Sequence, residues 1–314
     1  MMQQTTGMPR LHKVIFLVLL AFLIALPFFV YPVFAMKVMC FALFAAAFNL
    51  LLGFGGLLSF GHAAYFGGAS YVAAHAAKVW GLTPELSVLA GTAAAAVLGL
   101  LIGSLAIRRQ GIYFAMVTLA FAQLVYFLAL QLPFTGGEDG IQSVPRGDLF
   151  GLISLQNNMA LYFFVLAVTF GGILFLYRVV HSPFGQVLKA IRENEPRAIS
   201  LGYDVNRYKL TVFVLSATFA GMAGAMKSQV FQLASLTDVH WGMSGEVVLM
   251  TLLGGMGTVF GPLAGAAIIV TMQNYLATFG AWVTIIQGVI FVIGVLLFRE
   301  GIVGVISRWI RRPL

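Results

Sequence analysis

Charged residues are scarce in this chain, and cysteine is almost absent. Only 9% of its 314 residues are Asp, Glu, Lys or Arg, whereas about a quarter is usual in soluble domains. So few charges would leave most of a water-facing surface apolar, which excludes a soluble globular protein. The single cysteine, Cys40, lies in an apolar run, which excludes an intramolecular disulfide and any cysteine-based metal motif.

Apolar residues are abundant instead. Hydrophobic residues make up 61% of the chain and the mean hydropathy is +0.97, which excludes disordered, collagenous and coiled-coil proteins. The apolar residues form long runs, whereas those of a transmembrane β-barrel alternate with polar ones. The sequence therefore predicts an all-α integral membrane protein, with residues 1–314 as a single transmembrane domain.

Ten stretches are long and apolar enough to cross a hydrocarbon core of about 30 Å as helices. The first is longer than the apolar part of a secretory signal peptide, so we expect it to be retained. The second, eighth and ninth are short and interrupted by glycine, so one or two of them are alternatively re-entrant or broken helices. The ten predicted spans are residues 14–35, 37–53, 57–77, 86–107, 111–132, 159–179, 211–233, 244–260, 262–279 and 281–298.

The basic residues are distributed unevenly between the two predicted sides of the membrane. With a cytoplasmic N-terminus and ten crossings, both termini are cytoplasmic and 14 of the 18 lysines and arginines fall inside, in agreement with the positive-inside rule. The net charge of +8 is then mostly a topology signal, with anionic membrane lipids as expected neighbours and no nucleic acid partner. The residues predicted inside are Arg10, Lys13, Arg108, Arg109, Arg178, Lys189, Arg192, Arg197, Arg207, Lys209, Arg299, Arg308, Arg311 and Arg312.

A first glycine-rich segment covers Asn49 to Tyr71 and reads NLLLGFGGLLSFGHAAYFGGASY. Six glycines are costly in a helix interior, but they allow unwinding that exposes main-chain amides and carbonyls to a pathway. Close helix packing alone is the alternative explanation. Because polar groups at membrane depth are expensive, we favour a broken helix beside a translocation pathway. The candidate pathway residues here are Asn49, Gly55, Gly56, Ser59 and His62.

A second glycine-rich segment, GGMGTVFGPLAGA, covers Gly254 to Ala266. Its spacing resembles that of the first, since Leu253-Gly254 matches Leu52-Gly53 and Phe260-Gly261 matches Phe60-Gly61. The matching elements fall in the third and eighth predicted spans, which run in opposite directions. This pattern predicts an inverted repeat of two five-helix halves, as in many transporters.

A polar stretch from His181 to Lys209, within residues 180–210, is the only long one predicted inside. Ser182 and Pro183 predict the start of a helix, whose apolar residues Phe184, Val187, Leu188 and Ile191 form one stripe. The stripe has two interpretations: a helix lying on the membrane surface, or a docking surface for a cytoplasmic partner.

Other polar groups indicate no catalysis by this chain. No GxxxxGK[ST] sequence occurs, so we expect no ATP binding, and the histidines lack metal-site spacing. We therefore expect no metal and no cofactor.

Glu246, near the outer end of the eighth span, joins the pathway candidates because intramembrane carboxylates are often functional. Interhelical hydrogen bonding and an interfacial position are the alternative explanations for this residue.

The chain resembles the LivH/LivM family of permease subunits of ABC importers for branched-chain amino acids, and more closely the LivM type. The match runs nearly end to end. It rests on the first glycine-rich segment, GIYFAMVTLAFAQ (111–123), TGGEDGI (135–141), SPFGQVLKAIRENEPRAISLG (182–202) and LLGGMGTVFGPLAGA (252–266).

The resemblance implies a fold related to the type II importers and several partners. These are a second, LivH-type permease subunit, two cytoplasmic ATPases and a periplasmic substrate-binding protein, all at a bacterial inner membrane. It also implies that residues 180–210 form the element that couples the permease to the ATPases. Ala190, Glu195, Ala198 and Gly202 stand at matching positions, and Phe184, Lys189 and Arg192 complete the coupling candidates.

The function that the resemblance implies is ATP-driven import of leucine, isoleucine or valine by alternating access. Urea, short amides or other small carboxylates are alternative cargoes within the same family. An ion-coupled secondary transporter would need intramembrane carboxylates, for which Glu246 is the one candidate. A membrane enzyme would need a cluster of catalytic residues, and the sequence shows none.

Overall fold

The computed structural model describes residues 10–280, 282–297 and 301–310. Single-turn 3-10 helices lie at Leu26–Phe28, Pro133–Thr135, Gly137–Asp139 and Ala277–Phe279, and a π-helical turn at Leu50–Phe54. The other elements are α1 (Arg10–Ala25), α2 (Pro32–Asn49), α3 (His62–Lys78), α4 (Pro84–Ala106), α5 (Ile112–Gln131), β1 (Ile141–Gln142), β2 (Asp148–Leu149), β3 (Ile153–Ser154), α6 (Asn158–His181), α7 (Pro183–Glu193), α8 (Glu195–Ser200), α9 (Val205–Phe231), β4 (Leu233–Ala234), α10 (Leu236–Val239), α11 (Trp241–Gly254), α12 (Gly261–Leu276), α13 (Trp282–Leu297) and α14 (Gly301–Ile310).

Local sequence signals set several helix starts. Proline occupies the first turn of α2, α4, α7 and α12, where its missing N–H costs no hydrogen bond. Side-chain oxygens cap other starts: Asn157 accepts from the Met159 amide at 2.9 Å, and Asn194 accepts from the Arg197 amide at 3.0 Å. The predicted cap at Ser182 is present, with the Gly185 amide 3.4 Å from its Oγ atom.

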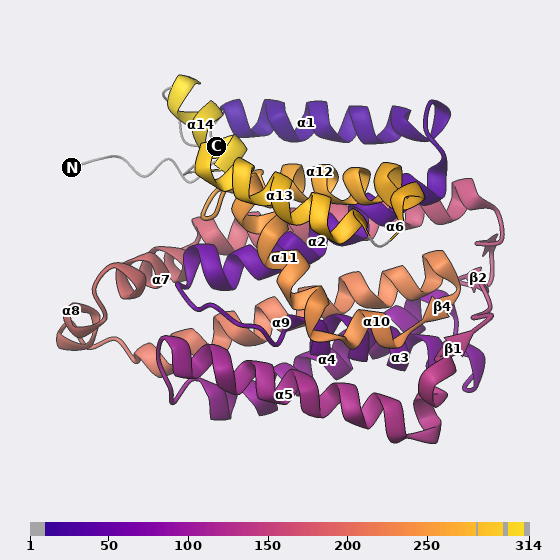
Figure 1. Ribbon diagram of the computed structural model, residues 1–314, viewed down its shortest axis with the longest axis horizontal. Helices are drawn as coiled ribbons and strands as arrows, with labels where there is room; N and C mark the ends of the chain where they lie inside the picture. The colour runs from indigo at the N-terminus through magenta and orange to yellow at the C-terminus, as the bar shows by residue number, and fades with distance from the viewer. Residues whose placement is uncertain (1–9, 281, 298–300, 311–314) are drawn as a thin grey trace.

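The long helices lie side by side in one bundle, with α1 along one side and α5 along the opposite side (Figure 1). The central helix α2 is almost entirely buried because α6, α9, α11 and α12 all pack against it. Its apolar residues accordingly surround the helix on all sides instead of forming one stripe. At Gly224 of α9, a side chain would overlap the Phe66 carbonyl of α3, so glycine allows these two helices to touch.

Six helical stretches in the described residues are long and apolar enough to cross a membrane: Leu11–Phe28, Pro32–Phe54, Pro84–Ala106, Ile112–Gln131, Asn158–His181 and Val205–Phe231. The other four predicted spans coincide with shorter helices, α3, α11, α12 and α13, of 14 to 17 residues. A 16-residue helix is only about 24 Å long, less than the hydrocarbon core. Ten full crossings therefore stay a prediction, and residues 281 and 298 of the last span lie outside the described chain.

The loops predicted on the two sides of the membrane lie at opposite ends of the bundle. Helices α7 and α8 lie at one end, and strands β1, β2 and β4 at the other (Figure 1). At the first end, Gln110 of the α4–α5 connection contacts Glu195. At the second, β1 pairs with β4, and the Lys78 ammonium donates to the Gln142 carbonyl at 2.7 Å. Which end faces the cytoplasm stays a prediction; Arg299, Arg311 and Arg312 lie outside the described residues.

Candidate functional site

The first glycine-rich segment breaks its helix. The π-helical turn ends at Phe54, residues 55–61 are non-helical, and α3 begins only at His62. Gly56 adopts φ +70°, a conformation that L side chains rarely take. The broken helix predicted here is present, but the predicted span 57–77 begins inside the non-helical part.

The second glycine-rich segment follows a similar course. Helix α11 ends at Gly254, residues 255–260 are non-helical, and α12 begins at Gly261. Gly255 and Gly257 have φ values of +128° and +77°. Both glycine-rich segments thus form a helix, a short unwound connection and a second helix. The inverted repeat inferred from their spacing stays a prediction.

The two glycine-rich segments meet at Asn49, the last residue of α2 and the first of the first segment. Its side-chain amide donates to the Thr258 carbonyl at 2.8 Å, and its side-chain oxygen accepts from the Gly257 amide at 2.9 Å. Asn49 is 2% exposed, so both hydrogen bonds satisfy groups that water does not reach. A cavity of about 20 Å³ beside Asn49 has room for one water but not for an amino acid. The contact between the two segments is therefore closed in this structure.

A buried polar centre surrounds the start of α3. His62 Nε2 lies 2.8 Å from Ser216 Oγ on α9, and the Ala63 amide donates to Ser244 Oγ on α11 at 2.9 Å. Because Ser216 Oγ donates its one hydrogen to the Ala47 carbonyl, His62 must donate from Nε2. Its Nδ1 atom is then an acceptor, and it has no hydrogen-bond partner among the residues that the structure describes. Ser59, a further pathway candidate, is also fully buried and accepts from the Gly61 amide.

Glu246 lies apart from this polar centre. It is partly buried in α11, shares a side-chain hydrogen bond with Gln273 of α12, and interacts electrostatically with Lys37 and Lys227. Eight residues separate it from Gly254, which is about 12 Å along a helix. The structure thus brings together Asn49, the glycines, Ser59 and His62, but not Glu246.

The helix predicted to couple the permease to an ATPase contacts the first glycine-rich segment directly. The Arg192 guanidinium donates to the Gly53 carbonyl, and the Lys189 ammonium lies 5.6 Å from the centre of the Phe54 ring. A Cβ atom at Gly56 would lie 3.0 Å from Cγ of Arg192, so the main chain packs against the arginine side chain. Two of the predicted coupling residues therefore hold the end of the π-helical turn.

The apolar stripe of α7 packs on this chain's own bundle. Leu188 and Ile191 are 1% and 3% exposed, and Phe184 stacks on Tyr208 of α9 with ring centres 5.4 Å apart. Both interpretations of the stripe, a membrane-surface helix and a partner-docking face, overlooked this packing, because the sequence does not show which internal surface is complementary. Ala198 of α8 is buried in the same way. The exposed residues of this region include Gln186, Ala190, Arg192, Glu193, Arg197, Ile199, Leu201 and Gly202.

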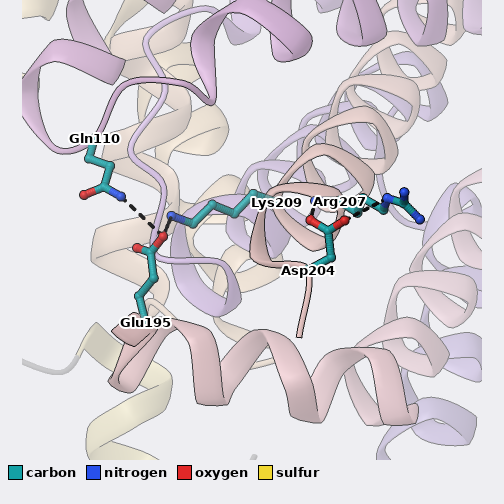
Figure 2. A network of polar contacts seen from close by, with 5 residues as sticks. All are labelled: Gln110, Glu195, Asp204, Arg207 and Lys209. Atoms are coloured by element: carbon teal, nitrogen blue, oxygen red, sulfur yellow. Dashed lines mark hydrogen bonds and ion pairs between the residues drawn. The ribbon is translucent and has the colours of Figure 1, made fainter. Parts of the chain in front are cut away.

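An ion pair ties the start of α8 to α9. The Lys209 ammonium lies 2.7 Å from Glu195 Oε1, which also accepts from the Gln110 side-chain amide at 3.3 Å (Figure 2). The Lys209 side chain is 8% exposed, so solvent screens this pair little. The neighbouring pair of Asp204 and Arg207, at 2.8 Å, is far more exposed.

Arg146 holds the opposite end of the bundle together. Its guanidinium donates to the Gln229 carbonyl at 3.2 Å, to the Val230 carbonyl, and to Asn158 Oδ1 at 2.9 Å. The two carbonyls belong to the last turn of α9, where a cation is favoured by the helix dipole. Burial lowers the pKa of Arg146 from its ordinary value.

The family described as "Branched-chain amino acid transport system / permease component" matches residues 32–295. The chain belongs to this family. It is therefore a multi-pass membrane permease of the ABC transporter class, and the matched region includes both glycine-rich segments and α7 to α9.

Relatives within this permease class carry different cargoes. The chain is 30% identical to the high-affinity branched-chain amino acid permease LivM of Escherichia coli and 29% identical to that of Salmonella typhimurium, over 68% of this chain in each case. It spans 56% of the length of these two relatives. It is also 29% identical to the ribose import permease RbsC of Bacillus subtilis, over 57% of this chain and 58% of the relative. No solved structure matches.

Sequence reasoning missed several polar residues of this candidate site. Ser216 contacts His62, Ser244 accepts from the Ala63 amide, and Lys209 and Gln110 hold Glu195, but none of the four was a candidate. Ser216 and Ser244 carried a usable signal, since each is a polar residue in a predicted span. Gln110 carried none, because its partner is 85 residues away in the sequence.

Proposed function

We propose that this chain is a permease subunit of an ATP-driven importer that moves leucine, isoleucine or valine into the cytoplasm. The observation that carries the proposal is the contact of α7 with the first glycine-rich segment, through Arg192 and Gly53. It gives a direct mechanical route from a helix at the end of the bundle to the unwound connections inside it. The family and the LivM relatives support the cargo.

The pathway in this proposal runs past the buried polar centre. An amino acid with an apolar side chain carries one ammonium and one carboxylate, so it needs a few polar groups in an otherwise apolar route. The unwound residues 55–61, the start of α3 and the acceptor Nδ1 of His62 provide such groups. The Asn49 contact closes this route in the present structure, and opening requires the two segments to separate.

The exposed face of α7 and α8 is the proposed docking surface for the ATPases. Ile199 and Leu201 are 57% and 68% exposed. The small side chain of Ala190 is also exposed, and charged residues lie near it in the sequence. ATP-driven closure of the ATPases would press on this face. Arg192, through its hydrogen bond to the Gly53 carbonyl, and Lys189, beside the Phe54 ring, would then move the end of the π-helical turn.

Ribose is the second candidate cargo, because the RbsC relative is as similar in identity over a shorter region. Urea and short amides remain further alternatives.

The decisive experiment reconstitutes the chain in proteoliposomes with its partner permease, ATPases and binding protein. ATP-dependent uptake of labelled leucine is then compared with uptake of labelled ribose and urea.

Uptake of leucine that requires ATP and every subunit supports the proposal. ATP-dependent uptake of ribose or urea alone retains the transport mechanism and replaces the cargo. Uptake by the isolated chain without ATP contradicts the importer assignment. Arg192→Gln provides the internal test of coupling, with Arg178→Gln, an exposed arginine of α6 outside the proposed docking surface, as its matched control.

A further inference from the structure

A cavity of about 250 Å³ opens between the last turn of α4 and the first turns of α9. Ile107 and Leu210 form its apolar lining. Its polar lining consists of Ser104, Arg108, Asn206 and Arg207. The cavity lies away from the glycine-rich segments and plays no part in the proposed pathway.

Glycines explain why the cavity lies where it does. Gly99 and Gly103 of α4 allow a close approach to α9, since a Cβ atom at Gly99 would lie 2.5 Å from the Ala217 Cβ atom and one at Gly103 would lie 2.7 Å from the Phe213 ring. The two helices are therefore in contact at these positions. Ile107 and Arg108 follow the end of α4 and lie beyond this contact, where they line the cavity.

The side of α4 that leads to the cavity is apolar and exposed. Val97 and Leu101 are each 57% exposed, and Leu105 is 50% exposed. Helix α4 is among the six stretches that can cross a membrane, so this side is suited to contact acyl chains. Arg108 follows directly after it. An exposed apolar face that ends in arginines is the pattern expected at the level of lipid headgroups.

The charge around the cavity is positive. Arg108 and Arg207 line it, Arg109 is adjacent in sequence, and Asp204 is the opposing carboxylate, paired with Arg207 at 2.8 Å. The Arg207 and Asp204 side chains are 86% and 52% exposed, so this pair is weak and leaves the guanidinium open to a stronger partner. Guanidinium groups bind phosphate through paired hydrogen bonds.

We propose that this cavity binds the phosphate headgroup of one anionic phospholipid, whose acyl chains lie along the exposed face of α4. Arg108 and Arg207 hold the phosphate from two different helices, and the lipid thereby bridges α4 to the start of α9. The start of α9 follows α8 directly, so the lipid stabilises the base on which the α7–α8 region rests.

The test measures lipid retention by native mass spectrometry on the full chain, purified in mild detergent with the subunits that accompany it. Phosphatidylglycerol or phosphatidylcholine is added back. We expect one phosphatidylglycerol per chain to be retained in preference to phosphatidylcholine. Retention should fall by about fivefold for each of Arg108→Gln and Arg207→Gln, as expected for loss of one basic residue near an anionic headgroup.

Arg109→Gln is the matched control, because it removes an arginine that is also exposed but does not line the cavity. Equal retention in the control and in the Arg108→Gln/Arg207→Gln double variant would overturn the proposal. Displacement of the lipid by inorganic phosphate would identify a general anion site instead. A photo-crosslinker at Ser104 that captures a protein subunit instead of lipid would also overturn it. None of these readouts depends on transport, so the result is independent of the cargo.

Discussion

The guanidinium of Arg192 donates a hydrogen bond to the main-chain carbonyl of Gly53, 139 residues earlier in the chain. This bond joins α7, at one end of the bundle, to the point where the helix continuing from α2 unwinds. Asn49, four residues before Gly53, joins the same region to Gly257 and Thr258. Two successive sets of hydrogen bonds therefore connect α7 to both glycine-rich segments.

We expect Arg192→Gln to lower ATP-dependent uptake by roughly tenfold, because a charge-assisted hydrogen bond contributes about 1.5–3 kcal/mol and glutamine is too short to replace it. ATP hydrolysis by the assembled complex should fall less than uptake, since Ala190, Ile199 and Leu201 of the proposed docking surface are unchanged. Uptake and hydrolysis are measured on the same proteoliposomes. Equal uptake by Arg192→Gln and the Arg178→Gln control would remove Arg192 from the coupling route.

Gly56→Ala tests the packing of the first unwound connection against Arg192. Alanine at φ +70° costs roughly 1–2 kcal/mol, and its Cβ atom would also press on the arginine side chain. Gly81→Ala is the control, because Gly81 has φ +64° and nothing within 4 Å of a Cβ atom. We expect both variants to lose stability in detergent, measured by thermal unfolding, but only Gly56→Ala to lose uptake. Loss of uptake in both variants would mean that backbone strain alone is responsible.

Asn49 is expected to hold the closed contact through both ends of its amide. In Asn49→Ala the Gly257 amide and Thr258 carbonyl lose their partners inside the bundle, which costs about 1–3 kcal/mol for each group left unsatisfied. Asn49→Asp retains the acceptor for Gly257 and loses the donor to Thr258, and it adds a buried charge. The measurement is accessibility of a cysteine at Thr258 to a thiol reagent in a background lacking Cys40. It should rise in both variants, and unchanged labelling would show that Asn49 does not close this contact.

The sequence alone predicted the helical segments well and their contacts poorly. Long apolar runs and prolines at helix starts are local signals that can be read from neighbouring residues in the sequence. The positions of α2, α4, α6 and α9 could therefore be predicted. The hydrogen bonds of Asn49 reach residues 208 and 209 positions away, and hydropathy carries no information about such pairings. The same limit explains the α7 stripe: its period predicted a buried face, but complementarity with α9 and the π-helical turn emerged only in the folded bundle.

Two ion pairs near α8 differ in burial, and a comparison of their energies tests how firmly α8 is fixed. Lys209 and Glu195 have side chains 8% and 27% exposed, whereas Arg207 and Asp204 are 86% and 52% exposed (Figure 2). In double-mutant cycles, Lys209→Met with Glu195→Gln should show a coupling free energy of about 1–2 kcal/mol. Arg207→Gln with Asp204→Asn should show at most about 0.5 kcal/mol, because solvent screens exposed pairs.

Denaturant titration in mixed micelles gives the free energies of unfolding for both cycles. The buried pair should keep most of its coupling energy in high salt, whereas the exposed pair should lose what it has. If the two cycles gave equal coupling energies, burial would not be what distinguishes the pairs. In that case Glu195 would be free to leave Lys209 and contact an ATPase, and α8 would be a mobile part of the coupling region instead of a fixed one.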